Sequence, residues 1–445
     1  MPEIASPSAS TLNPAKTARQ RTDTFTSIWM MIAVAMALAT LVAKSRMPQP
    51  LWTMIHLVTL GVLSNGIFQW SWFFARSLAR LSADDPRARR HNTIRVLIFN
   101  AFFASLFVSM WLGWMVGTMI AATGIAAVAA WHGAEMLSVL RERLASRFVI
   151  VVRYYVCSAS FFVLAALLAS FVSATMFSPS IPEAMVAMRD RLTLAHALSG
   201  VAGWVGLTIG GTVITLGPTI LRTRMSPDAV SGGVRVLLPW CLSLLLAIAG
   251  ALLGVMSLVG AGILAVGACA IVGIVYPYAK VLRNKGPREY SAWSFLLGLL
   301  WISVGVCALG VAALFVSTPS QLRALTLMWL PIIGIAGFAQ LFQGALSYLM
   351  PVVIGGGPSI VRIGIAIIDW QFPLRLGLRN SALILELFLF FAGDSTSVHV
   401  LRMAGWFLVI ATFVIDVVIY AKTGVTQARA RRARSETLSE SRQVQ

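Results

Sequence analysis

Residues 236–279 read VLLPWCLSLLLAIAGALLGVMSLVGAGILAVGACAIVGIVYPYA, and no charged side chain interrupts them. The hydrocarbon core of a bilayer is about 30 Å thick, and an α-helix needs about 20 apolar residues to cross it. The stretch is therefore long enough for two membrane-spanning helices. Only a tight turn, which we expect near Leu258, remains between them, so the two helices must form an antiparallel hairpin.

The whole chain has the same apolar character. Hydrophobic residues make up 58% of its 445 residues, charged residues only 11%, and the mean hydropathy is +0.82. A soluble globular protein carries roughly 25% charged residues. The composition therefore excludes a soluble enzyme, a disordered chain and a coiled coil, and the unbroken apolar runs lack the alternation of a membrane β-barrel. We expect an all-α, polytopic integral membrane protein.

Twelve apolar segments are long enough to span a membrane, and a second tight turn, at Gly113, predicts another antiparallel hairpin. Residues 1–26 and 422–445 are polar, and we expect them to be cytoplasmic tails on either side of a membrane domain at 27–421. No cleavable signal peptide is expected, because no short apolar stretch precedes an A-x-A site. The predicted spans are 27–44, 51–74, 95–112, 114–136, 148–176, 192–220, 235–257, 259–280, 291–316, 324–352, 378–393 and 399–421.

The basic residues predict the direction of these helices. The net charge is +19, from 35 Lys and Arg against 16 Asp and Glu. With the N-terminus inside, 29 of the 35 basic residues fall on the inner side and 6 on the outer side. Short cytoplasmic loops of membrane proteins are rich in Lys and Arg. We therefore expect a protein of the bacterial plasma membrane with both termini on the cytoplasmic side.

This concentration of Lys and Arg on the inner side explains the positive net charge, so no nucleic-acid partner is expected. The two largest basic clusters are expected to contact anionic lipid headgroups, although the C-terminal cluster is also suited to a protein partner. They consist of Arg87, Arg89 and Arg90, and of Arg429, Arg431, Arg432 and Arg434.

Two predicted spans end in the same pattern. Residues 211–218 read GTVITLGP and residues 344–351 read GALSYLMP, at an offset of 133 positions. A weaker match adds the span at 51–74, because His56 opens it as His196 opens the first of the other two. These spans are four helices apart, and repeats at a fixed helix count are typical of bundles built from related units. We therefore expect a pseudo-repeat of four-helix units.

His56 and His196 lie at similar depth near the outer surface. Imidazole suits both iron and copper, so the pair predicts a site for one haem or one copper ion; contact with lipid headgroups is the alternative. Gly200 and Gly203 follow His196 along one stripe of the helix. A stripe without side chains leaves either a slot for a flat ligand or a seam for a neighbouring helix, and packing is the usual role of small residues in membranes.

The remaining ionisable residues inside spans are few. We expect His132 and Glu135 to belong to an interfacial polar belt at the inner membrane surface. Glu386 and Asp416 are intramembrane carboxylates, and an ion pair with an arginine, a proton path and a hydrogen bond in helix packing all remain open for them. The four cysteines occur singly, which supports neither a disulfide framework nor a thiolate metal site.

The chain resembles subunit I of haem–copper oxidases and the related NnrS membrane proteins. The likeness rests on twelve spans, three units of four helices, and histidines at the outer ends of spans two and six. Residues 195–225, 344–351 and 355–358 are similar to an uncharacterised group of actinobacterial membrane proteins. Some members of that group are joined to or accompanied by cupredoxin or multicopper-oxidase-type domains, so the resemblance implies haem or copper and an extracytoplasmic copper protein as partner.

The chain departs from the oxidases at their catalytic centre. They carry further histidine ligands on spans seven and ten, whereas residues 235–257 and 324–352 contain none, and Trp329 stands at the place that matches His196. A binuclear haem–copper centre cannot be assembled from this pattern, so no catalytic residue is predicted and an enzyme is not the favoured class.

Three functions remain open from the sequence. The first is an oxidase-like or NnrS-like protein with one haem or copper, which acts in redox chemistry or nitrogen-oxide metabolism. The second is a transporter for a small solute or metal ion, with the glycine-rich faces of spans two, six and ten as its cavity. The third is a membrane anchor for an extracytoplasmic copper protein.

Overall fold

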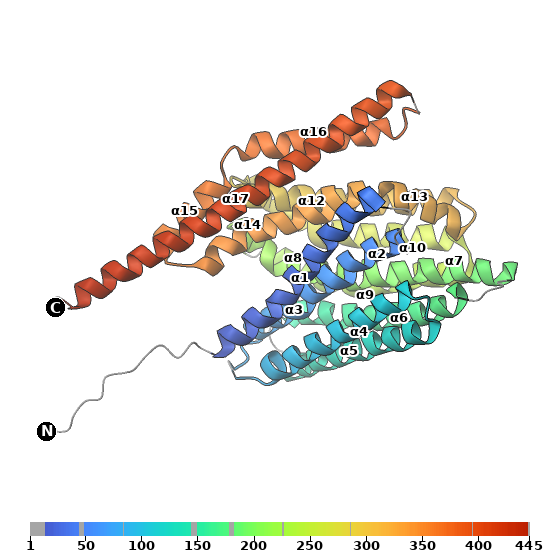
Figure 1. Cartoon of the computed structure of the whole chain (residues 1–445), viewed down its shortest axis with the longest axis horizontal. Coiled ribbons are helices and arrows are strands. Elements are labelled where there is room, and N and C mark those ends of the chain that lie inside the picture. The colour runs from blue at the N-terminus through green and yellow to red at the C-terminus, as the bar shows by residue number, and fades with distance from the viewer. Residues whose placement is uncertain are drawn as a thin grey trace. The chain divides into compact units, whose positions relative to one another are not determined.

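A computed structural model describes residues 14–43, 49–82, 84–143, 149–177, 182–224, 227–284, 286–393 and 395–443. Within these ranges the chain is almost entirely helical and has no strand. It divides into two compact units (Figure 1). Unit 1 consists of Met1–Ile214, Gly233–Gly262 and Ser317–Pro319, and unit 2 of Thr215–Gly232, Ile263–Val316 and Ser320–Gln445.

Unit 1 is built on long helices, several of which are interrupted by π-helical turns (η). Its elements are α1 (Pro14–Ala43), α2 (Pro50–His56), η2 (Leu57–Ser64), α3 (Asn65–Leu78), η3 (Arg87–His91), α4 (Asn92–Trp111), α5 (Met115–Glu142), α6 (Val149–Met176), α7 (Glu183–Ala197), η4 (Leu198–Gly206), the first half of α8 (Leu207–Ile220), most of α9 (Pro227–Leu253) and the start of α10 (Met256–Ala270).

Unit 2 also consists of helices with π-helical segments, and it includes the C-terminal part of the chain. It contains the end of α8, the start of α9, the end of α10, η5 (Ile271–Val275), α11 (Tyr276–Asn284), α12 (Tyr290–Phe315), nearly all of α13 (Pro319–Ile332), η6 (Ile333–Ala339), α14 (Gln340–Ile354), α15 (Pro358–Ile368), α16 (Phe372–Leu389) and α17 (Thr396–Gln443).

The two tight turns expected from the sequence occur at glycines with a left-handed backbone. Gly113, between α4 and α5, has φ +66° as predicted. The second turn is at Gly254, with φ +76°, because α10 already begins at Met256. The expected turn near Leu258 is therefore wrong by four residues. Glycine adopts this conformation at no steric cost, since it has no Cβ.

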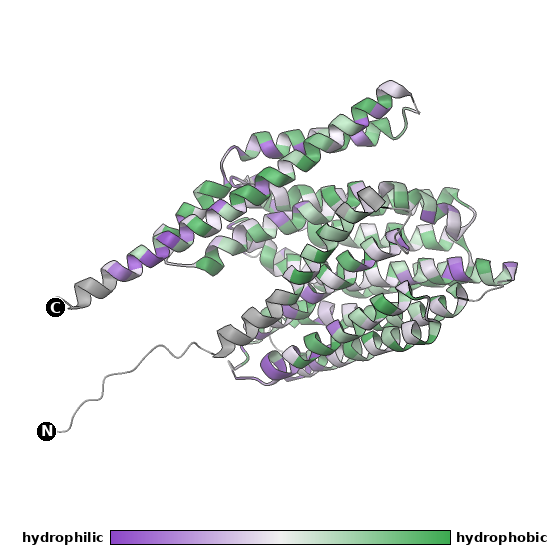
Figure 2. Cartoon of the chain, in the orientation of Figure 1, coloured by the Kyte–Doolittle hydropathy of each residue, from purple (hydrophilic) through white to green (hydrophobic). Residues whose placement is uncertain are grey.

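Ten helices among the described residues are long and apolar enough to cross a membrane. They expose large apolar side chains as well: Leu112, Phe407 and Phe315 expose 74%, 74% and 85% of their area. Figure 2 shows that hydrophobic residues predominate along the helices. Side chains of this kind need a lipid environment, so the chain is a multi-pass membrane protein.

The twelve spans predicted from the sequence include two that differ from these ten helices. At 27–44 the structure has α1, which runs to Ala43; its continuously described apolar part is Phe25–Ala37, and the rest of this predicted span is not fully described. At 378–393 the structure has α16, which starts earlier and carries the buried charged residues Arg375 and Arg379. These charges lower its hydropathy below that of an ordinary membrane helix.

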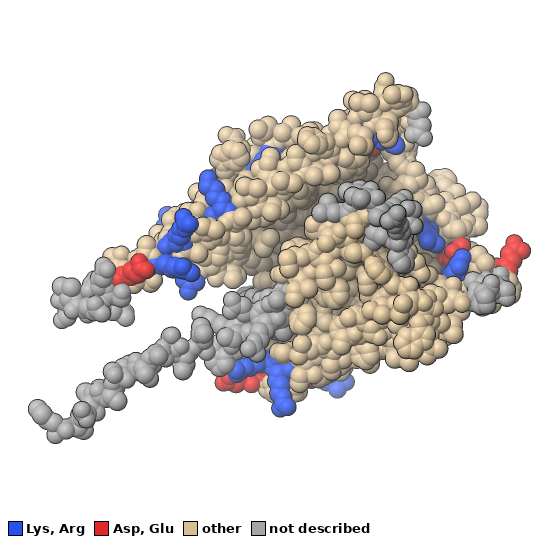
Figure 3. Space-filling view, in the orientation of Figure 1, with Lys and Arg blue, Asp and Glu red and all other residues tan. Residues whose placement is uncertain are grey.

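The polar segment 422–445 does not form a separate tail in its described part. Figure 1 shows α17 running on as one helix to Gln443. Thr423 and Gln427 are fully buried, and the basic residues that follow gather on the C-terminal part of α17 (Figure 3). Of the other expected tail, residues 1–13 lie outside the described residues, and residues 14–26 begin α1.

Four of the described spans are interrupted by a π segment, namely η2, η4, η5 and η6, and three of these share a packing pattern. In each case the π segment packs against the long helix that precedes it in the chain: η2 against α1, η4 against α6 and η6 against α12. The segments η4 and η6 end at Gly206 and Ala339, which are 133 positions apart, as are the two sequence patterns. A π segment widens the helix locally and often occurs at functional sites.

Candidate metal site

His56 and His196 occupy corresponding places in unit 1. His56 is the last residue of α2, directly before η2, and His196 lies in the last turn of α7, just before η4. Both histidines therefore stand where an α-helix widens into a π segment. The structure brings these two predicted site residues together.

The two imidazole rings lie close together, and their planes are nearly parallel. Their centroids are 6.1 Å apart and their planes differ by 16°. Trp52 stacks on the ring of His56, with centroids 4.4 Å apart. Both rings are half-buried, so they are shielded by protein but remain within reach of a small ion.

A backbone carbonyl fixes the tautomer of each ring. The Nδ1–H of His56 donates to the Trp52 carbonyl at 2.9 Å, and the Nδ1–H of His196 donates to the Ala165 carbonyl at 2.8 Å. A carbonyl only accepts hydrogen bonds, so Nδ1 must carry the proton and Nε2 keeps a lone pair. In the described part of the chain, Nε2 of neither ring has a hydrogen-bond partner. Metal-binding histidines are oriented by second-shell bonds of this kind.

The ring separation fits a single ion. An imidazole nitrogen lies about 2.0–2.1 Å from a bound metal, so two imidazoles on opposite sides of one ion hold their ring centres about 6 Å apart. The described residues contain no group of three His, Cys, Asp or Glu side chains that could hold a metal. The protein thus offers two ligands, which suit a low-coordinate ion.

The glycine stripe below His196 is filled by a neighbouring helix. A Cβ on Gly203 would lie 2.5 Å from the Cβ of Phe161, and one on Gly211 would lie 2.6 Å from the Cβ of Tyr154. At Gly200 a Cβ would make only an ordinary contact with Ala165, at 3.8 Å. Gly203 and Gly211 therefore form a packing seam with α6, and this seam leaves no slot for a flat ligand at Gly203.

The other histidines lie away from this pair. His132 is fully buried between aromatic rings, with its Nε2 3.2 Å from the Ser71 hydroxyl, and is not part of an exposed interfacial belt. His91 hydrogen-bonds Glu135, and His399 is exposed. No third imidazole joins the pair within the described residues.

A buried charge cluster in unit 2 is more extensive than the sequence indicated. Asp416 is fully buried and pairs with both Arg375 and Arg379, which is one of the alternatives that the sequence left open. The hydroxyl of Tyr290 also donates to Asp416 at 2.7 Å, and Arg379 donates to Gln343 at 2.8 Å. Arg375 and Arg379 are four residues apart and therefore lie on one face of the helix. This spacing is the sequence signal that could have indicated a shared acidic partner.

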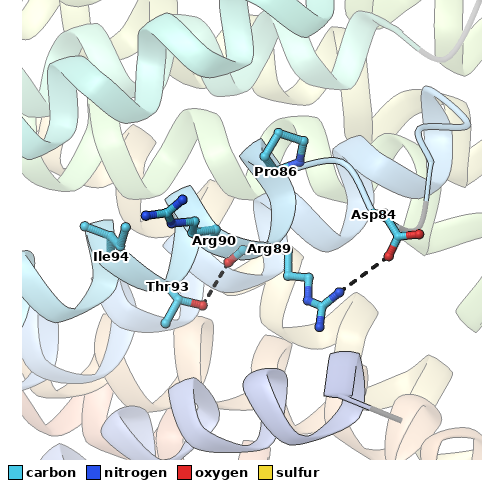
Figure 4. A pocket seen from close by; sticks show the side chains of 6 residues that line it. All are labelled: Asp84, Pro86, Arg89, Arg90, Thr93 and Ile94. Carbon is cyan, nitrogen blue, oxygen red and sulfur yellow. Dashed lines mark hydrogen bonds and ion pairs between the residues drawn. The ribbon is translucent and has the colours of Figure 1, made fainter.

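A surface pocket of about 490 Å³ lies at η3 and the start of α4 (Figure 4). Arg89 reaches Asp84 at 3.4 Å across its mouth, and Thr93 bonds back to the Arg89 carbonyl. The pocket contains neither His56 nor His196. Its lining residues are Asp84, Pro86, Arg89, Arg90, Thr93 and Ile94.

No protein-family model matches the chain, and no curated protein is significantly similar to it in sequence. The function therefore has to be argued from the site.

Proposed function

We propose that this membrane protein holds one copper ion between Nε2 of His56 and Nε2 of His196, on the extracytoplasmic side of the plasma membrane. The observation that carries the proposal is the pair of parallel rings, 6.1 Å apart, each anchored through Nδ1 to a carbonyl. Imidazole is a good copper ligand. The ion would serve a redox or nitrogen-oxide-related process together with an extracytoplasmic copper protein, which is the partner implied by the resemblance.

Copper fits the site better than haem. A macrocycle between the rings needs a flat slot beside them, and Phe161 fills that space at Gly203. A single ion needs only the gap between the two nitrogens. The half-buried rings also leave open coordination positions through which a partner protein can deliver or remove copper.

The same ligand count argues against an oxidase. Reduction of oxygen or nitric oxide in the oxidases that the chain resembles needs a haem iron and a second metal held by several imidazoles. Two imidazoles support one centre. The purified chain should therefore consume neither gas, and measurable consumption by the wild-type chain would contradict the proposal.

The oxidase-like architecture is part of the proposal, and a repeated hydrogen-bond motif supports it. In unit 1, the Trp29 indole donates to Oδ1 of Asn100 at 2.6 Å. Asn65, the first residue after η2, exchanges hydrogen bonds with Asn100 at 3.2 and 2.7 Å. The motif joins the first three of the four predicted spans of this part of the chain.

Unit 2 contains the same motif on its own helices. The Trp301 indole donates to Oδ1 of Asn380 at 2.8 Å. Gln340, the first residue after η6, exchanges hydrogen bonds with Asn380 at 3.2 and 3.0 Å. The three helices concerned, α12, α13–η6–α14 and α16, stand eight predicted spans after those of the first motif. We take this as support for a pseudo-repeat of four-helix units, in which α16 and the apolar part of α1 count as spans.

Transport of a metal ion is the second candidate, and the π segments within the spans favour it. Discontinuous helices in the middle of spans are common at the substrate sites of transporters. In that case the histidine pair would be an entry site. Uptake of labelled copper into proteoliposomes would establish transport, whereas retention of one bound ion per chain without uptake supports the first proposal.

Copper loading tests the proposal directly. The purified chain, titrated with Cu(I) against a competing chelator, should bind one ion, and either His56→Ala or His196→Ala should weaken binding at least tenfold. His399→Ala, which removes an exposed imidazole away from the pair, is the matched control and should bind like the wild type. If the wild type shows a haem absorption band that disappears in the double histidine variant, the bound group is haem and not copper. Equal copper binding in all variants would refute the site.

A further inference from the structure

Arg95 in α4 is fully buried in unit 1. Its guanidinium carbon lies 5.0 Å from the ring centre of Trp72 and 5.3 Å from that of Trp131. Indole faces attract cations, but they do not accept hydrogen bonds from the remaining N–H groups in the way an oxygen does. Only Nη2 finds oxygen partners, at 3.2 and 3.3 Å, on Arg87 and Asn92.

Several polar atoms around this guanidinium have no hydrogen-bond partner among the residues that the structure describes. They are Nε and Nη1 of Arg95, Nε1 of Trp72, Nδ1 of His132 and Oε2 of Glu135. Trp72 exposes 2% of its area and His132 none. A buried donor without an acceptor costs about 1–3 kcal/mol, and a charged one more. So many unpaired groups in one place indicate that something else occupies the space between them.

Glu135 does not satisfy Arg95 by itself. Its Oε1 lies 3.6 Å from Nη1 of Arg95, which is an ion-pair distance but too long for a hydrogen bond. That oxygen already interacts with His91 at 2.9 Å and accepts from the Trp131 indole at 3.0 Å. One carboxylate thus faces one arginine and one histidine.

The other acids nearby are used by a different arginine. Asp85 and Glu142 both hydrogen-bond the Arg87 guanidinium. This contact holds the pKa of the Asp85 carboxyl below its usual value. Neither carboxylate is therefore available to Arg95.

We infer that a small monovalent inorganic anion, such as chloride or nitrate, binds among Arg95, Trp72 and His132. The unpaired groups are mostly N–H donors, with Glu135 supplying the one unpaired carboxylate oxygen. Buried water offers donors and acceptors alike, whereas an anion only accepts.

The test is thermal unfolding of the full chain in detergent, in sodium gluconate exchanged stepwise for sodium nitrate or sodium chloride at constant ionic strength. Ligands that bind only the folded state raise the unfolding temperature saturably. Trp72→Phe keeps the ring but removes one unpaired N–H, and should raise the half-saturating nitrate concentration between about twofold and tenfold. Trp131→Phe is the matched control, because its N–H already bonds Glu135, and its half-saturating concentration should equal that of the wild type.

Arg95→Met should abolish the nitrate response, and if this variant does not fold, the two tryptophan variants still decide the question. An unfolding temperature that does not depend on which anion is present would mean that only water fills the site. An identical half-saturating concentration in Trp72→Phe and the wild type would likewise overturn the inference.

Discussion

Nε2 of Gln427 donates a hydrogen bond to the backbone carbonyl of Pro351 at 2.7 Å. The bond ties the C-terminal part of α17 to the end of α14, within unit 2. Gln427 is fully buried, and Arg431 and Arg434 continue the contact by donating to the carbonyls of Ile354 and Gly356 at 2.7 and 2.9 Å. The C-terminal segment is thus part of the folded structure of this unit.

Truncation after Gly424 should therefore destabilise the protein. It removes the bonds of Gln427, Arg431 and Arg434, and hydrogen bonds contribute about 0.5–1.5 kcal/mol each. We expect a loss of about 2–4 kcal/mol, visible as a lower unfolding temperature and less monodisperse protein. Truncation after Thr437, which keeps these contacts, is the control. Equal stability of the two truncated chains would show that the contacts contribute nothing.

Asp416→Asn should be among the most damaging single changes in unit 2. It leaves Arg375 and Arg379 buried without a carboxylate, and breaking a buried ion pair on one side costs about 3–5 kcal/mol. Asp84→Asn is the matched control, because Asp84 is 86% exposed and its pair with Arg89 is a surface pair. The folded yield and the unfolding temperature report the difference. Similar values for both variants would contradict a structural role of the cluster.

The two tryptophan–amide motifs predict matched effects in separate parts of the chain. Asn100→Leu and Asn380→Leu each remove one carboxamide, so an indole N–H loses its acceptor and the side-chain oxygen of a second amide loses its donor. Each should destabilise the protein by about 2–4 kcal/mol. Ser77→Ala, at an exposed hydroxyl, should have little effect on the unfolding temperature. If only one of the two asparagine changes lowers the unfolding temperature, the two motifs are not equivalent and do not support a pseudo-repeat.

Reporter fusions test the predicted direction of the helices. A reporter that is active only in the cytoplasm should be active after Gln445. It should be silent when inserted between Phe177 and Pro182, because the charge distribution places that connection outside. The insertion point lies before α7, since the loop expected at 177–191 is helical from Glu183 onward. The opposite pattern of activity would reverse the topology.

Much of the fold follows from hydropathy, because the membrane imposes one length on every apolar helix. The exceptions have a physical cause. The predicted span at 378–393 starts six residues after the first residue of α16 and leaves out Arg375, because only the tertiary contact with Asp416 allows Arg375 and Arg379 to be buried. Likewise, the polar composition of the end of α17 predicts a separate tail. The sequence does not show that backbone carbonyls at the end of α14 accept hydrogen bonds from this segment.

The candidate site was predictable in part. Equal depth on two predicted spans was enough to pair His56 with His196. The anchoring carbonyl of Ala165 was not, since its position depends on how α6 packs against α7. The choice between ligand slot and packing seam at Gly203 also required the position of Phe161.

X-ray absorption at the copper edge of the copper-loaded, purified chain tests the central claim most directly. The account predicts a first shell of two imidazole nitrogens at about 2 Å, present in the wild type and in His399→Ala and lost in the double variant His56→Ala, His196→Ala. A first shell containing sulfur, or the same spectrum from the double variant, would contradict it.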